Sequence, residues 1–295
     1  MDWLIDPFAL GIQQRALLAG SLAAIVFAVV GTWVVIRGMT FLGDALVHGV
    51  IPGIALAVLF DFNVLIGAAI AALVMVAGIN FVHHQTEFSE DTGIGLLFAG
   101  MLALGVILIS TTDDGSGTLN AILFGNALGV STADIAVLGV VVTVTIGGTM
   151  LLYRRLLVLA FNEQKAALFG LKPRLTHAIL LVLITLSIVG SFRTVGTLLV
   201  FGLLVGPPAT AALLVRRVPT MMATAGAIGI LSVVGGLIIS YHARTSGSAT
   251  MALIPIVLFF IVLGVKSLGR DATGHQSERG HQSAEHREAS DQAPT

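Results

Sequence analysis

The chain alternates long apolar runs with short polar connections. Runs of roughly 17 to 25 apolar residues are long enough to cross the hydrocarbon core of a bilayer, about 30 Å, as helices. The apolar runs cover residues 16–36, 41–60, 64–82, 93–110, 131–152, 176–190, 196–215, 221–241 and 251–265. The sixth and ninth runs are the shortest. The pattern therefore predicts an all-α, polytopic integral membrane protein with nine transmembrane helices, and eight is the alternative.

Composition supports insertion of most of the chain into a membrane. Of its 295 residues, 56% are hydrophobic and only 11% are charged, and the mean hydropathy is +0.98. A soluble core of this length needs far less apolar material. The formal net charge of −1 leaves no basic surplus for binding nucleic acid. The chain has no cysteine, so any metal must be bound through oxygen and nitrogen.

The two ends differ from the apolar region between them. Residues 1–15 lack the basic region and cleavage site of a secretory signal, so we expect a retained extracytoplasmic segment ahead of a transmembrane domain at 16–266. Residues 267–295 carry mixed charges and no aromatic residue, which predicts a disordered cytoplasmic tail. His275, His281 and His286 lie in that tail, but their irregular spacing on a flexible chain makes a poor metal site.

Two ionisable residues interrupt the second apolar run. Asp44 and His48 are four residues apart, which puts both side chains on one helix face. Inserting an ionised carboxylate at the centre of a membrane helix costs a free energy of roughly 2.5 to 3.5 kcal/mol on insertion scales, so such a residue is expected to have a binding partner or a function. One carboxylate oxygen and one imidazole nitrogen suit a cation such as Zn2+ or Mn2+. The alternative is a polar pair that satisfies itself near a helix start, where the dipole favours an acidic residue.

Lysine and arginine in the short connections predict the orientation. With nine spans, the basic residues between spans five and six, after span seven and after span nine all face one side, which the positive-inside rule assigns to the cytoplasm. The N-terminus is then outside and the C-terminus is cytoplasmic. Arg193 is the misfit, because it is predicted to lie outside. The membrane is most simply a bacterial plasma membrane.

The connection at residues 160–173 reads AFNEQKAALFGLKP and predicts a short helix. Asn162 is a suitable N-cap, Glu163 lies in the first turn, and Gly170 with Pro173 forms a stop signal. Such a helix either docks on a cytoplasmic partner or rests on the membrane surface. Residues 118–130 form another short apolar segment, which we expect to be interfacial or re-entrant.

The chain carries no motif of an enzyme or a motor. It has no phosphate-binding P-loop, no zincin helix and no nucleophile elbow. We therefore expect a transport subunit, with ATP hydrolysis, if any, on another protein.

Three separated blocks carry a resemblance to a known family. They are VVIRGMTFLGDALVHGVIPGIAL at 34–56, the block at 160–173, and VGTLLVFGLLVGPPATAALL at 195–214. With these blocks in the family's order, the chain resembles the permease subunits of manganese, zinc and iron ABC importers, the ABC-3 metal permeases, over nearly all of residues 16–266. The implied fold is that of a type II ABC importer permease.

The resemblance implies roles for particular residues. Asp44 and His48 correspond to an intramembrane metal-coordinating pair. The block at 160–173 resembles a coupling helix that docks on the ATP-hydrolysing subunit. The residues implied for coupling are Asn162, Glu163, Ala167 and Gly170, and those implied for a proline-broken helix beside the pathway are Gly206, Pro207 and Pro208. Prolines free helix carbonyls, which line a cavity or permit a hinge.

The resemblance also implies partners. These are an ATP-binding cassette ATPase, an extracytoplasmic metal-binding lipoprotein and a second copy of the chain. Two ligands from one helix are too few to hold Mn2+, Zn2+ or Fe2+, whereas two copies of Asp44 and His48 supply four. The cation is the cargo, and no permanently bound cofactor is expected.

The sequence departs from the family pattern at three positions. Val47 stands where a serine is common, Asn162 where an aspartate is common, and Arg193 where an uncharged residue is common. Two rival functions stay open at this point. One is a proton- or cation-coupled secondary transporter in which Asp44 titrates, and the other is an importer of the same type for siderophores or cobalamin.

Overall fold

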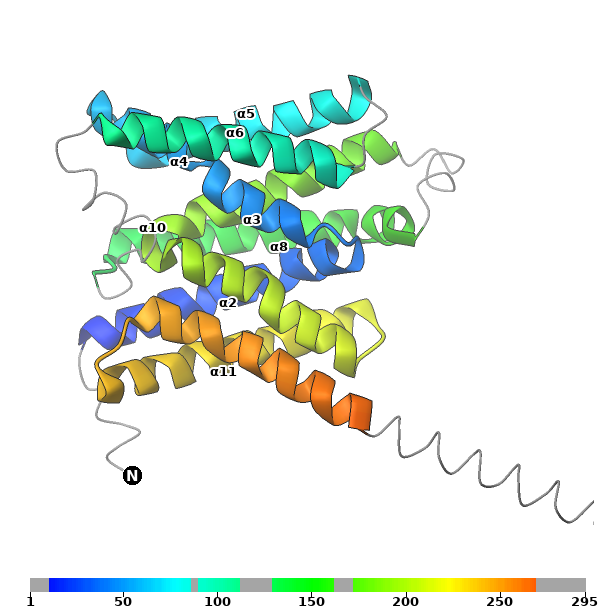
Figure 1. Cartoon of the computed structure of the whole chain (residues 1–295). Helices are drawn as coiled ribbons and strands as arrows, with labels where there is room; N and C mark the ends of the chain where they lie inside the picture. Colours follow the sequence, from blue (N-terminus) through cyan, green and yellow to red (C-terminus); the bar gives the residue numbers. More distant parts are fainter. Residues whose placement is uncertain (1–10, 86–89, 112–128, 162–171, 269–295) are drawn as a thin grey trace, which may run out of the picture.

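The computed structural model describes residues 11–85, 90–111, 129–161 and 172–268, and the regular structure in these ranges is helical (Figure 1). The helices are α2 (Gly11–Ile36), α3 (Thr40–Gly49), α4 (Ile51–Leu59), α5 (Val64–Gln85), α6 (Glu90–Ser110), α8 (Thr132–Phe161), α10 (Pro173–Leu214), α11 (Val218–Ala243) and a C-terminal helix, Gly247–Leu268.

Within the described ranges, nine helical segments are long and apolar enough to cross a membrane. Helices α3 and α4 together form one span, Thr40–Leu59, and α10 supplies two, Pro173–Phe192 and Thr194–Leu214. The prediction of nine spans is therefore confirmed, including the short sixth and ninth. Figure 1 shows the spans running between the same two ends of the bundle. One end contains the close of α8 and the start of α10, and we call it the α8–α10 end.

Helix α2 lies at the centre of the bundle and packs against α8, α10 and α11. Small residues let these backbones approach closely. Such close van der Waals packing helps membrane helices associate, because lipid supplies no hydrophobic driving force between them. A Cβ on Gly20 would lie 2.7 Å from Val233 of α11, and one on Gly229 would lie 3.0 Å from Ala24. Toward the α8–α10 end, the fully buried ring of Trp33 meets Tyr153 of α8 edge to face at 5.8 Å.

Helix α10 contains a sharp break at Gly196, where φ is +72° and ψ is 167°. This backbone conformation is essentially restricted to glycine. In Figure 1 the first half of α10 runs away from the α8–α10 end, and the second half runs back toward it. The chain therefore reverses direction at Gly196, and the two halves of α10 form two antiparallel spans.

Helices α3 and α4 pack closely against α10 and α5 at glycines. A Cβ on Gly43 would lie 2.5 Å from Leu204 of α10, and one on Gly49 would overlap the sulfur of Met75 in α5. Gly53 of α4 and Gly67 of α5 face each other so closely that a Cβ on either would overlap the other's carbonyl oxygen. The span that carries Asp44 and His48 therefore packs on its neighbours through close contacts at glycines, which larger residues would prevent.

Candidate cation-binding site

Asp44 and His48 lie on the accessible face of α3. The buried residues of the helix are Leu42, Gly43, Ala45, Leu46, Val47 and Gly49. The side chains of Asp44 and His48 are 28% and 26% exposed, and Asp44 Oδ1 lies 3.5 Å from His48 Nε2. Helical spacing brings the pair together as the sequence predicted.

The separation of the two donor atoms suits ligands that share one cation. Ligands bound at roughly 2.1 Å, at tetrahedral or octahedral angles, lie roughly 3.0 to 3.4 Å apart. The 3.5 Å between the carboxylate oxygen and the imidazole nitrogen is close to that range and is long for a hydrogen bond. A small side-chain rotation is enough to let both atoms bind one ion.

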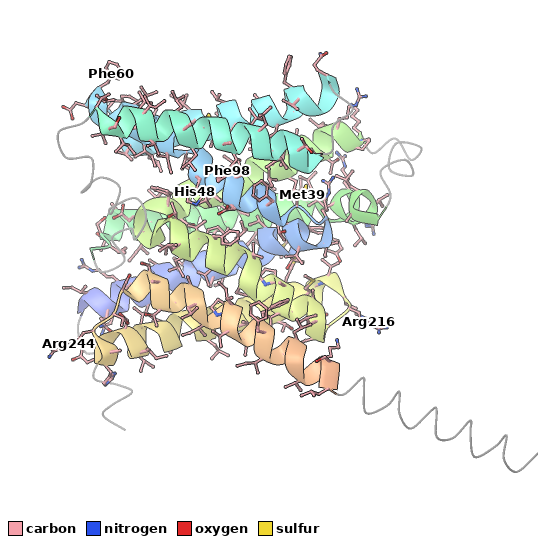
Figure 2. The ribbon with its side chains drawn as sticks, viewed as in Figure 1. Met39, His48, Phe60, Phe98, Arg216 and Arg244 are labelled. Atoms are coloured by element: carbon pink, nitrogen blue, oxygen red, sulfur yellow. The ribbon has the colours of Figure 1, made fainter. Side chains whose placement is uncertain are left out.

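The pair lies well inside the bundle along the direction of the spans. In Figure 2, Arg216 and Arg244 mark opposite ends of the molecule, and His48 lies between them on the face turned toward the viewer. Met39 lies nearer the Arg216 end, and Phe60 lies at the other. A cation bound at His48 would therefore be remote from both ends of the spans.

Aromatic rings border the pair. Phe98 of α6 meets His48 edge to face at a centroid distance of 5.9 Å and Phe41 of α3 at 5.7 Å. Sequence reasoning missed Phe98, because a phenylalanine in a membrane span gives no signal that separates it from a lipid-facing residue. Only the packing of α6 on α3 reveals it.

The helix is interrupted directly after His48. Helix α3 ends at Gly49, Val50 separates the two helices, and α4 begins at Ile51 with Pro52 in its first turn. Pro52 has no amide hydrogen to donate to the carbonyl of His48, four residues earlier, whereas proline is well suited to the first turn of a helix. The sequence analysis treated residues 41–60 as one uninterrupted run, although Pro52 was the available signal for this break.

Gly206, Pro207 and Pro208 lie elsewhere, in the second half of α10. All three are buried, and non-helical dihedrals in α10 are recorded at Gly196 instead. Gly206 packs on Pro255 of the C-terminal helix, and Pro208 packs on Gly31 of α2. Their role in a pathway or hinge stays a prediction.

Several predicted features lie outside the described residues. These are the coupling residues Asn162, Glu163, Ala167 and Gly170, most of the segment 118–130, the tail histidines and the side chain of Arg193. The ends that flank the coupling segment are described, because α8 ends at Phe161 and α10 begins at Pro173.

One polar contact near the start of α10 was not predicted. The guanidinium of Arg37, just after α2, donates a hydrogen bond of 2.7 Å to Nδ1 of His177 in α10. It ties the connection between α2 and α3 to the first turns of α10.

Comparison with known proteins identifies the family. The model of the ABC 3 transport family matches residues 10–266. The manganese transport system membrane protein MntC of Listeria innocua is 36% identical over 251 residues, which cover 85% of this chain and 89% of that protein. The manganese import system permease protein ScaB of Streptococcus parasanguinis is 36% identical over 264 residues, which cover 88% and 94%.

A solved structure agrees with these relatives. PsaBC from Streptococcus pneumoniae, in complex with Fab, superposes with a TM-score of 0.78 at 31% identity and covers 88% of this chain and 94% of that chain. The family match, the two relatives and the nine described spans lead to one conclusion. The chain belongs to the ABC 3 transport family and is a multi-pass membrane permease of an ATP-binding cassette transporter, whose ATPase is a separate subunit.

Proposed function

We propose that this permease imports a divalent transition-metal cation, with Mn2+ as the principal cargo, into the bacterial cytoplasm along the face of α3 that carries Asp44 and His48. The observation that carries the proposal is a carboxylate and an imidazole, 3.5 Å apart, on the accessible face of α3 in mid-bundle. The names of the relatives support manganese, and the ligand chemistry also accepts Zn2+ and Fe2+.

A second copy of the chain completes the site in this proposal. Among the described residues, no group of three or more His, Cys, Asp or Glu side chains is placed to hold a metal ion. One copy therefore offers two ligands there, whereas zinc takes four and manganese takes more. Two copies that present Asp44 and His48 to a shared path supply four. Modest, transient affinity suits a conduit, because an ion that is held too firmly does not leave.

The α8–α10 end is the cytoplasmic end in this proposal. Arg154 and Arg155 lie near the close of α8, Arg174 near the start of α10, and Arg216 and Arg217 between α10 and α11. The positive-inside rule favours the cytoplasm for such an end. The ATPase would bind there through residues 160–173, including Asn162, Glu163, Ala167 and Gly170. An extracytoplasmic metal-binding lipoprotein would deliver the cation at the opposite end, near Asp61 and Arg244.

The test is transport by the complete importer in liposomes. Permease variants Asp44→Asn and His48→Ala are assembled with the ATPase and the binding protein, and uptake of radioactive manganese is measured with ATP. We expect loss of uptake, with assembly and basal ATP hydrolysis retained, because only the metal ligands change. Thr143→Ala on α8 is the control, since its hydroxyl bonds to the carbonyl of Gly139 on the exposed side of that helix. Uptake at wild-type rates in both ligand variants would remove the pair from the mechanism.

A further inference from the structure

Phe41 shares the accessible face of α3 with the two metal ligands. It precedes Asp44 by three residues and His48 by seven, so the three side chains follow one stripe of the helix. Phe41 is 39% exposed. At a rise of about 1.5 Å per residue, Phe41 lies about 4.5 Å from Asp44 along the axis, on the side toward Met39 and the α8–α10 end.

Phe98 of α6 connects this ring to the site. Its centroid lies 5.7 Å from that of Phe41 and 5.9 Å from that of His48, and both interplanar angles are 69°. These are edge-to-face contacts of the kind that aromatic pairs favour. Phe98 is itself half-buried, so the three rings form a continuous aromatic border beside the carboxylate.

The Phe41 ring lies close to Gly95 of α6. A Cβ on Gly95, one turn before Phe98 in α6, would lie 3.7 Å from Cε1 of Phe41, which is ordinary contact. A longer side chain at position 95 would displace the ring. Helix α6 thus both supplies Phe98 and leaves the space in which Phe41 lies against it.

A cation that leaves Asp44 toward the α8–α10 end along this face meets Phe41 and Phe98 next. Neither ring offers an oxygen or nitrogen ligand, and apolar constrictions of this kind close channels by excluding water. We infer that Phe41 and Phe98 form an apolar constriction that closes the cation path on the α8–α10 side of the Asp44–His48 pair. The inference rests on the proposed function, because it takes this face of α3 as the path.

The experiment measures cation leak through the assembled importer. Liposomes that contain a manganese-sensitive dye and the full complex are exposed to Mn2+ with and without ATP. The variants are Phe98→Ala, Phe41→Ala and the bulk-retaining Phe98→Leu. Leu96→Ala is the matched control, because Leu96 lies on the same helix with 70% of its side chain exposed. We expect both phenylalanine-to-alanine variants to raise Mn2+ entry without ATP several-fold, whereas Phe98→Leu and Leu96→Ala stay at the wild-type rate.

Two results would overturn the constriction. One is wild-type entry without ATP in both alanine variants, and the other is equal leak through Phe98→Ala and Phe98→Leu. If Phe98→Ala fails to assemble, Phe41→Ala decides, because its exposed ring contributes less to folding. Asp44→Asn in the same liposomes separates the two proposals. If Asp44→Asn blocks ATP-driven uptake while the phenylalanine-to-alanine variants show no added Mn2+ leak, only the constriction is wrong. If it transports normally, the proposed function is wrong.

Discussion

Two of the proline-containing spans of this permease, Thr40–Leu59 and Thr194–Leu214, respond to proline differently. In Thr40–Leu59 the helix is interrupted at Val50, two residues after His48 and two before Pro52, although Val50 itself keeps right-handed helical dihedrals. In Thr194–Leu214 the helical dihedrals continue through Pro207 and Pro208, and the irregular residue of α10 is Gly196. Proline removes an amide hydrogen in both spans. The difference must therefore come from the surroundings.

The neighbour of α10 accounts for its continuity. Pro208 cannot donate to the carbonyl of Leu204, and that oxygen points at Gly31 of α2, where a Cβ would overlap it. At so close an approach, a glycine Cα–H group can act as a weak donor to such a freed oxygen. In α4, by contrast, Pro52 occupies the first turn, where the amide hydrogens have no partner within the helix in any case. The helix is interrupted two residues before Pro52, which lies in the first turn of α4. It continues through Pro208, where the backbone of α2 meets the carbonyl oxygen that the proline leaves without a donor.

The largest effect is expected from filling the space at Gly31. Gly31→Ala places a methyl group against the Leu204 carbonyl and should lower the free energy of unfolding by about 1 to 3 kcal/mol, as overpacking does. Gly139→Ala in α8 is the control, because a Cβ there meets nothing within 4 Å. Thermal unfolding of the purified complex in detergent measures both. Equal stability of the two variants would show that the α2–α10 contact does not support the proline segment.

A comparable loss of folding stability is expected from a substitution at Gly196, where the helical dihedrals of α10 are interrupted. Gly196→Ala forces a side chain into a backbone conformation essentially limited to glycine, which costs about 1 to 3 kcal/mol. Gly147→Ala, which lies in open space on α8, should be neutral or slightly stabilising. The same thermal measurement applies, and an unchanged melting temperature for Gly196→Ala would mean that the chain does not turn there as described.

The two prolines can be compared directly by restoring the amide. Pro52→Ala restores an amide hydrogen in the first turn of α4, where the His48 carbonyl now accepts the N–H of Val50, and favours one continuous helix through the segment that follows His48. We expect a several-fold loss of Mn2+ uptake in liposomes. Pro208→Ala should reduce uptake less, because α10 is already helical there. The reverse order would instead favour the predicted hinge at Gly206, Pro207 and Pro208.

The smallest change in stability is expected from removing a hydrogen bond between α8 and the first half of α10. The hydroxyls of Thr145 in α8 and Ser187 in α10 are 3.2 Å apart and buried. Hydrogen bonds between membrane helices average about 0.6 kcal/mol, so Thr145→Ala should lower the melting temperature only slightly. A loss as large as that of Gly31→Ala would mean that polar contacts, rather than backbone proximity, hold α10 in place.

The sequence predicted the spans well and the site in part. Runs such as residues 221–241 are recognisable because lipid demands continuous apolar helices, and spacing alone put Asp44 beside His48. The break at Val50 was predictable from Pro52. The turn at Gly196 was less so, because a glycine-rich chain contains many glycines that serve packing alone. The contacts of Phe98 were not predictable, since they depend on which face of α6 meets α3.

The central claim is that the transported cation touches Asp44 and His48, and the most direct test is spectroscopic. The importer is prepared with isotope-labelled histidine, loaded with Mn2+, and examined by electron–nuclear double resonance, which detects histidine nitrogen bound to the metal. We predict a histidine coupling that disappears in His48→Ala, with Thr143→Ala unchanged. A coupling of undiminished strength in His48→Ala would contradict the account, because the metal would then be bound by another histidine.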